Sequence, residues 1–227
     1  MSTANFPSAL TEIPSISKVQ HVQRAILLGI FRGEFRPGDR LVEAVLAKRL
    51  GVSQTTVNQA LQDLHAQGIV NKAMNRATTV CLYGTPELEA LFSVRSELEC
   101  MAARAAACHL TTEAVAYLRL SVERMRTAAR TKDLPSFYLA DYEFHQALYE
   151  LSQNRFLIHA CQAITAAPFA YILCDRMEPL HADYAPTAED HEEIVQALMA
   201  GPEPAVQLVR SKVDRWFGWQ SEFLARK

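Results

Sequence analysis

The stretch 41–70 most constrains how this chain can fold. Its sequence, LVEAVLAKRLGVSQTTVNQALQDLHAQGIV, has the apolar periodicity of two short helices joined by a tight turn. Gly51 is typical of the left-handed end of a helix, and Ser53 is a good N-cap for the next one. The apolar positions predict one buried face on each helix. These positions are Val42, Val45, Leu46 and Leu50 in the first helix, and Val57, Leu61 and Leu64 in the second.

The exposed start of the second helix is polar and suits entry into a DNA major groove. A plain helical hairpin that never touches nucleic acid is the alternative. The flanking segments favour DNA binding, because a helix that ends at Gly33 precedes the motif and two short strands, 68–70 and 78–80, follow it around a tip at 72–76. This pattern predicts a winged helix-turn-helix. The expected DNA contacts are Arg36, Gln54, Thr55, Thr56, Asn58, Asn75 and Arg76.

In combination, four motifs resemble the GntR superfamily of bacterial transcription regulators. They are RPGDRL at 36–41, LAKRLGVS at 46–53, ALQDL at 60–64 and GIV at 68–70. The resemblance covers about residues 17–80 and implies a DNA-binding domain. The family usually carries arginine where Gln54 and Asn58 stand, and often proline at Thr56. Gln and Asn read adenine through paired hydrogen bonds, each worth roughly 1–3 kcal/mol, so we expect an altered base preference.

Composition fits one or two packed domains, with 227 residues of which 49% are apolar. Residues 1–80 hold nine Lys and Arg against five Asp and Glu, a net charge of +4, and the remainder carries −6. This asymmetry favours binding of phosphates by one end only. The five cysteines form no metal-finger spacing, residues 1–15 lack the basic and apolar blocks of a secretion signal, and no apolar run has the length of a membrane span. We therefore expect a cytoplasmic protein with no membrane contact.

The second part of the chain has helical periodicity throughout, which predicts a mainly α protein whose C-terminal domain is an all-α bundle of about six helices. Thr85 is the expected N-cap of the first, followed by Pro86. The expected divisions are a tail at 1–15, a winged helix-turn-helix domain at 16–80, a linker at 81–85 and the helical domain at 86–227. The expected helices are 86–109, 112–130, 134–152, 155–175, 188–200 and 204–225.

Charged or imidazole side chains interrupt the apolar seams of four of these helices. They are Arg95, Asp141, His145, His191 and Lys212. Isolated buried charges are costly, so such groups must be paired, bound to metal or solvated in a shared cavity. Taken one at a time, each is more often a satisfied core histidine or a local salt bridge. Taken as a set, they predict a ligand or metal pocket.

This domain resembles the FCD branch of the same superfamily. The motifs are DYEFHQAL at 141–148, SQN at 152–154, DHEEI at 190–194 and AL at 197–198, over about residues 86–225. In that family an Asp and three His commonly hold a divalent metal beside a small carboxylate effector. The resemblance implies three such ligands here, Asp141, His145 and His191. Lys212 stands where the fourth His is usual, and an ammonium has no lone pair for a metal.

Two arrangements remain open for the pocket. Either Asp141, His145 and His191 hold Zn, Ni or Mn while water or the effector completes the shell, or Lys212 takes the place of the cation. In the second arrangement Lys212 pairs with Asp141 and, together with Arg95, receives the carboxylate of the effector. The sequence favours the second.

Together, the motifs and the two resemblances predict a ligand-responsive transcription regulator that acts as a repressor and senses a small organic acid. We expect a homodimer that binds a pseudo-palindromic operator. A metal-dependent or metal-sensing regulator is the first alternative. An enzyme is a second, but the sequence has no nucleophile-base signature or cofactor loop, so we expect no catalysis. A helix-turn-helix that binds protein in place of DNA is the third.

Overall fold

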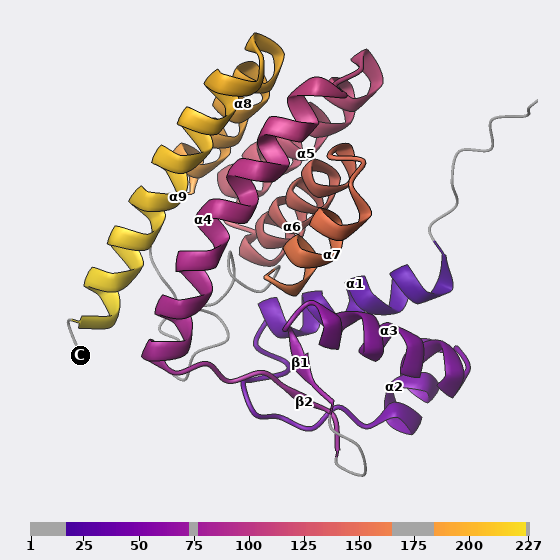
Figure 1. Ribbon diagram of the computed structural model, residues 1–227. Helices are drawn as coiled ribbons and strands as arrows, with labels where there is room; N and C mark the ends of the chain where they lie inside the picture. The colour runs from indigo at the N-terminus through magenta and orange to yellow at the C-terminus, as the bar shows by residue number, and fades with distance from the viewer. Residues whose placement is uncertain (1–16, 73–76, 165–183, 226–227) are drawn as a thin grey trace, which may run out of the picture.

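The computed structural model describes residues 17–72, 77–164 and 184–225. A winged helix-turn-helix forms the first part, and a bundle of helices forms the second (Figure 1). The first part contains α1 (Lys18–Phe31), α2 (Glu43–Leu50), α3 (Gln54–Ala66), β1 (Val70–Asn71) and β2 (Thr79–Val80). The second contains α4 (Thr85–Cys108), α5 (Thr112–Thr131), α6 (Leu134–Leu151), α7 (Arg155–Ala163), α8 (Ala185–Ala200) and α9 (Pro202–Ala225). The predicted mainly α fold is confirmed, and the expected tail at 1–15 lies outside the described residues.

The helix-turn-helix forms as its turn residues dictate. Gly51 ends α2 with a φ of 65°, a left-handed conformation that glycine adopts without a steric penalty. The hydroxyl oxygen of Ser53 then accepts a hydrogen bond from the backbone N–H of Thr56 at 3.1 Å and caps α3. In the wing, β1 and β2 pair antiparallel with Val70 opposite Val80. Both strands are shorter than predicted: β2 lies within the predicted 78–80, whereas β1 starts two residues later than the predicted 68–70 and extends to Asn71.

The predicted apolar face of α2 is wrong at two positions. Val42 and Val45 are 51% and 61% exposed. Val42 is the N-cap residue and lies outside the helix. Val45 is inside it, but an eight-residue helix that packs on one side buries only a narrow stripe of its own surface. That stripe consists of Leu46 and Ala47, both buried.

Capping residues explain most of the bundle's helix starts. Thr111, Asp133 and Asn154 cap α5, α6 and α7, each with a side-chain oxygen that accepts from a backbone N–H of the first turn. The expected cap at Thr85 is wrong by one residue, since Gly84 is the N-cap of α4. The backbone N–H of Gly84 donates to the Glu87 carboxylate at 2.8 Å, which fixes the start of the helix there.

The last two helices also start earlier than predicted, at Ala185 and Pro202. Proline is tolerated in the first turn of a helix, where the missing N–H has no intrahelical partner in any case. The expected helix 155–175 is described only as far as Ala163, and the rest of that prediction lies outside the described residues.

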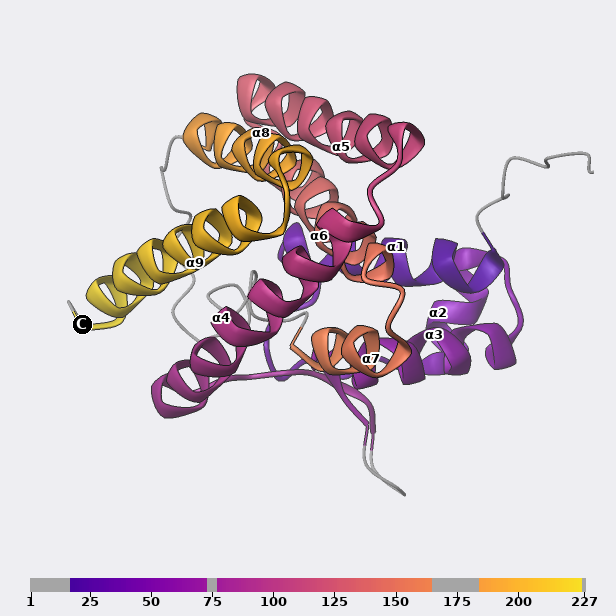
Figure 2. The same cartoon turned by 45° about the horizontal axis from the view of Figure 1, so that its top comes forward.

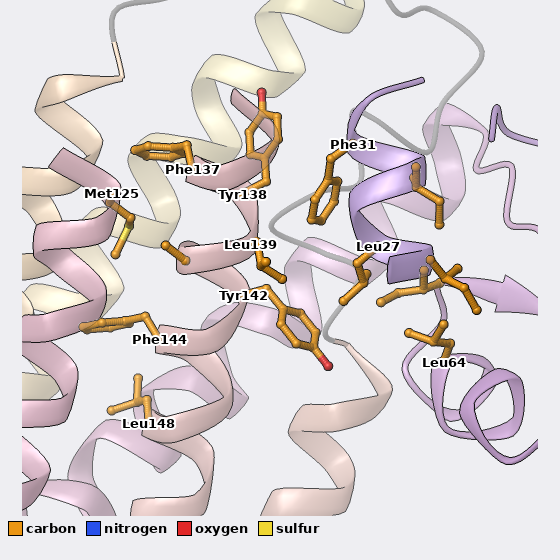
Figure 3. Close-up of a cluster of buried hydrophobic side chains, with 14 of the residues drawn as sticks. Leu27, Phe31, Leu64, Met125, Phe137, Tyr138, Leu139, Tyr142, Phe144 and Leu148 are labelled. Atoms are coloured by element: carbon orange, nitrogen blue, oxygen red, sulfur yellow. The ribbon is translucent and has the colours of Figure 1, made fainter. Parts of the chain in front are cut away.

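Helix α6 connects the two parts of the molecule. Figures 1 and 2 show α4 beside α9 and α5 beside α8. Figure 3 shows that one side of α6 faces α5 and the other faces α1 of the winged part. The side chains toward α5 are Phe137, Phe144 and Leu148, and those toward α1 are Tyr138, Leu139 and Tyr142. The rings of Phe31 and Tyr138 lie 5.4 Å apart, so the two parts share one apolar core. No described helix is long and apolar enough to cross a membrane.

Candidate metal centre and DNA-facing surface

Three predicted site residues come together inside the bundle. Asp141 and His145 lie one turn apart on α6, and His191 comes from α8; all three side chains are buried. Each offers one potential ligand atom, and these atoms lie within 4.8 Å of one another. The His191 ring meets the edge of the Phe144 ring, with centroids 4.7 Å apart, so apolar packing holds the imidazole in place.

The ring nitrogens of the two histidines have different surroundings. Nδ1 of His191 lies 2.7 Å from the carbonyl oxygen of Thr187, to which it donates. Nε2 of His191 lies 2.9 Å from Oδ1 of Asp141. With Nδ1 protonated, Nε2 carries a lone pair in the neutral imidazole and a proton directed at Asp141 in the imidazolium. Nε2 of His145 lies 3.9 Å from the same oxygen. Within the described part of the chain, His191 Nε2 and His145 Nδ1 are buried without a hydrogen-bond partner.

Burial and neighbouring charges oppose each other in this cluster. Burial favours the neutral form of Asp141, but His191, His145 and Arg95 outweigh it and hold the carboxyl pKa below its usual range. Burial would also lower the pKa of His191, but Asp141 outweighs it and raises that pKa. Burial dominates at His145 and lowers its pKa. The cluster thus holds an ionised carboxylate against one imidazole that favours protonation and one that favours neutrality.

A fourth buried group, Glu99 of α4, adjoins the cluster and was missed by the sequence reasoning. Its Oε1 accepts hydrogen bonds from Nε of Arg95 at 2.9 Å and from the hydroxyl of Tyr149 at 3.1 Å. The same oxygen lies 3.5 Å from Nδ1 of His145. Glu99 follows Arg95 by four residues on one helix, and this spacing is the signal that could have found it.

The predicted pairing of Lys212 with Asp141 is wrong. Lys212 is buried as predicted, but its Nζ contacts Oδ1 of Asp190 at 2.6 Å and Oε2 of Glu193 at 2.5 Å. Arg215 pairs with the other oxygen of Asp190. The ammonium therefore ties α9 to α8 beside His191 and does not replace a cation between the imidazoles. The Lys212 ammonium gains more electrostatic energy beside two carboxylates of the facing helix than it would beside Asp141, which already pairs with His191.

The predicted DNA contacts differ in their solvent exposure and in their hydrogen bonds within the protein. Gln54 and Thr55 are exposed at the start of α3, and Arg36 is exposed in the loop after α1. Thr56 is half-buried, and its hydroxyl lies 2.8 Å from that of Ser53. The predicted contacts at positions 75 and 76 lie outside the described residues.

Asn58 is held by its neighbours within the protein. Its Nδ2 donates to Oε1 of Glu43 at 2.9 Å, and its Oδ1 accepts from Nε2 of Gln62 at 2.9 Å. Nζ of Lys72, next to the wing tip, donates to the same oxygen of Glu43 at 2.8 Å. A carboxylate of α2 thus binds one side chain of α3 and one that directly follows β1.

Family comparisons agree with both halves of this architecture. The model of bacterial regulatory proteins of the gntR family matches residues 18–80, and the FCD domain model matches residues 90–214. The chain belongs to the GntR family, in its FCD branch. It is a DNA-binding transcription regulator with a GntR winged domain and an FCD helical domain.

Relatives of this GntR protein match along most of its length. One from Paenarthrobacter nicotinovorans, named "Probable D-xylose utilization operon transcriptional repressor", is 32% identical over 182 residues, which cover 79% of this chain and 78% of that protein. The HTH-type transcriptional regulator McbR of Escherichia coli is 26% identical over 196 residues, with 83% and 88% covered.

Two solved structures share the fold of this GntR protein. E. coli McbR/YncC superposes with a TM-score of 0.69 at 24% identity, over 92% of this chain and 99% of that one. A GntR regulator from Rhodococcus sp. RHA1 gives 0.62 at 24% identity, over 87% and 94%.

Proposed function

We propose that Asp141, His145 and His191 together hold one divalent ion, Zn, Ni or Mn, and that a small organic acid binds beside it as the effector of this regulator. The observation that carries this proposal is the buried cluster itself, whose three potential ligand atoms lie within 4.8 Å of one another and in which Nε2 of His191 has no hydrogen-bond partner among the described residues. Buried polar atoms without partners are rare and need a reason. A metal ion supplies one for His191, whose Nε2 lone pair faces a carboxylate oxygen.

The donor set suits an exchangeable site. One carboxylate and two imidazoles suit Zn, Ni or Mn. Three protein ligands leave at least one coordination position open, as in sites where water or a small molecule completes the shell. Because the ammonium of Lys212 is engaged with Asp190 and Glu193, the metal-binding arrangement is now favoured over the lysine-for-metal arrangement.

Arg95 is the group best placed to receive the carboxylate of an effector. Its guanidinium is buried and pairs with Glu99 through Nε, and its two terminal nitrogens form no hydrogen bond with the residues that the structure describes. The charge of Arg95 also acts on Asp141, so it lies close to the proposed ion. A carboxylate bound here would meet two positive centres in a site of low polarity.

At the DNA end, we propose a homodimer in which the two α3 helices read the half-sites of a pseudo-palindromic operator. A repressor is the favoured direction of control, supported by the printed name of the Paenarthrobacter relative. The proposed place of action is the cytoplasm. The helical site is proposed to bind and not to turn over its acid, in keeping with a family of regulators.

Fluorescence anisotropy with labelled DNA from the protein's own promoter tests this function. Protein stripped with a chelator is titrated first, then protein with Zn, Ni or Mn, then metal-loaded protein with a panel of small carboxylates. We expect salt-sensitive DNA binding whose affinity changes with metal and with at least one acid. His159→Ala, at an exposed histidine of α7, is the control for His191→Ala. DNA affinity that no metal and no acid alters would overturn the proposal. Absence of DNA binding would favour a protein-binding module.

A further inference from the structure

We infer that Glu99 is a positioning residue for the proposed metal: its carboxylate accepts the Nδ1 proton of His145 and thereby directs Nε2 of that histidine to the ion. The inference rests on the proposed metal-binding function and adds a fourth residue to it. Glu99 would not touch the metal. It would decide which nitrogen of His145 does.

Two hydrogen-bond donors and one imidazole nitrogen converge on one oxygen of Glu99. Oε1 accepts from Nε of Arg95 at 2.9 Å and from the Tyr149 hydroxyl at 3.1 Å, and it lies 3.5 Å from Nδ1 of His145. The Glu99 side chain is only 3% exposed. A buried carboxylate is normally retained only with full compensation, and here two donors from different helices fix it in place.

The 3.5 Å approach of His145 to Glu99 involves an imidazole nitrogen that lacks a hydrogen-bond partner. Nδ1 of His145 is buried, and none of the described residues forms a hydrogen bond with it. The Glu99 carboxylate is the acceptor that faces it, and a small rotation of the imidazole closes 3.5 Å to hydrogen-bond length. The proton then sits on Nδ1, and the lone pair of Nε2 faces Asp141.

His191 shows the same arrangement on the other side of the cluster. Its Nδ1 donates to the carbonyl oxygen of Thr187 at 2.7 Å, which leaves the lone pair of Nε2 on the side of Asp141. Two histidines from different helices would therefore present the same nitrogen to one point, one held by a backbone carbonyl and the other by a carboxylate. Metal-bound histidines are typically fixed in this way through their second nitrogen.

The test compares Glu99→Gln with Glu97→Gln. Glutamine keeps an oxygen for Arg95 and Tyr149, so the fold should survive, and Glu97 is an exposed carboxylate of the same helix that pairs with Arg210. Zn affinity is measured by competition with a chromophoric chelator. We expect Glu99→Gln to weaken Zn binding roughly 10- to 100-fold and Glu97→Gln to leave it unchanged.

A second readout needs no metal. Long-range ¹H–¹⁵N NMR on histidine-labelled, metal-free protein reports which nitrogen of His145 carries the proton. We expect Nδ1–H in the wild type, a weakened preference in Glu99→Gln, and an unaltered His191 in both. Protonation of His145 at Nε2 in the wild type, or equal Zn affinity in the two variants, would overturn the inference while the metal proposal stands. A wild type that binds no Zn, Ni or Mn would refute the metal proposal itself, and the inference with it.

Discussion

The hydroxyl of Tyr142 donates a hydrogen bond to Oε1 of Gln67 at 3.0 Å, and both side chains are buried. Gln67 is the C-cap residue of the recognition helix α3, and Tyr142 directly follows Asp141 on α6. Adjacent residues of α6 thus link the candidate metal site to α3, the helix that we propose reads DNA. Coupling between two sites requires such an element with two arrangements that each ligand favours differently.

Replacing Tyr142 by phenylalanine tests this link. Loss of the buried hydrogen bond should lower the free energy of unfolding by about 1 kcal/mol, with metal affinity retained. The ratio of DNA affinities with and without metal should move toward one, as measured by anisotropy. Tyr117→Phe, at an exposed tyrosine of α5, serves as control. An unchanged ratio in Tyr142→Phe would show that the signal travels elsewhere.

Gln54 and Asn58 should contribute unequally to sequence recognition. Gln54 is exposed, whereas the amide of Asn58 is held at both ends by Glu43 and Gln62. We expect Gln54→Ala to lose roughly 1–3 kcal/mol of discrimination between operator and random DNA, and Asn58→Ala to lose less. Competition binding against random DNA measures both. The reverse order would mean that Asn58 is released from Glu43 on the operator.

Lys212→Met separates the two arrangements that the sequence left open. Because the ammonium pairs with Asp190 and Glu193, its loss should cost about 1–3 kcal/mol of unfolding free energy, measured by denaturation, and leave metal stoichiometry unchanged. Loss of the carboxylate response without loss of stability would instead place Lys212 in the effector site.

The raised pKa of His191 makes metal-free stability depend on pH in a defined direction. A raised folded-state pKa stabilises fully below the unfolded value of about 6.5, and the contribution is lost as pH rises through the folded value. Chelator-treated wild type should therefore exceed His191→Gln in unfolding free energy by more near pH 5.5 than near pH 8.5. Metal should reverse the trend, because His191 must lose its proton to bind it. A difference that does not vary with pH would contradict the assigned Asp141–His191 pair.

Local chemistry made much of the fold predictable. Gly51 acts through its own backbone conformation, and the hydroxyl of Ser53 acts on a backbone N–H only three residues ahead, so both roles follow from the local sequence. The exposure of Val45 was not predictable, because it depends on how little of a short helix its neighbours cover.

The candidate site was only half predictable for a related reason. The inward positions of Asp141, His145 and His191 follow from helical periodicity. The partner of Lys212 does not, since Asp190 and Glu193 project from another helix, and their reach depends on how α8 and α9 pack. The sequence did not single out Glu99, because a glutamate in a helix is usually exposed to solvent.

Metal content of the purified protein tests the central claim most directly. Protein made without chelator and without a histidine tag is dialysed and analysed for Zn, Ni and Mn, beside His191→Ala and His159→Ala. The account predicts about one ion per chain in the wild type and in His159→Ala, and a loss in His191→Ala. A wild type that stays without metal after incubation with each ion would contradict it.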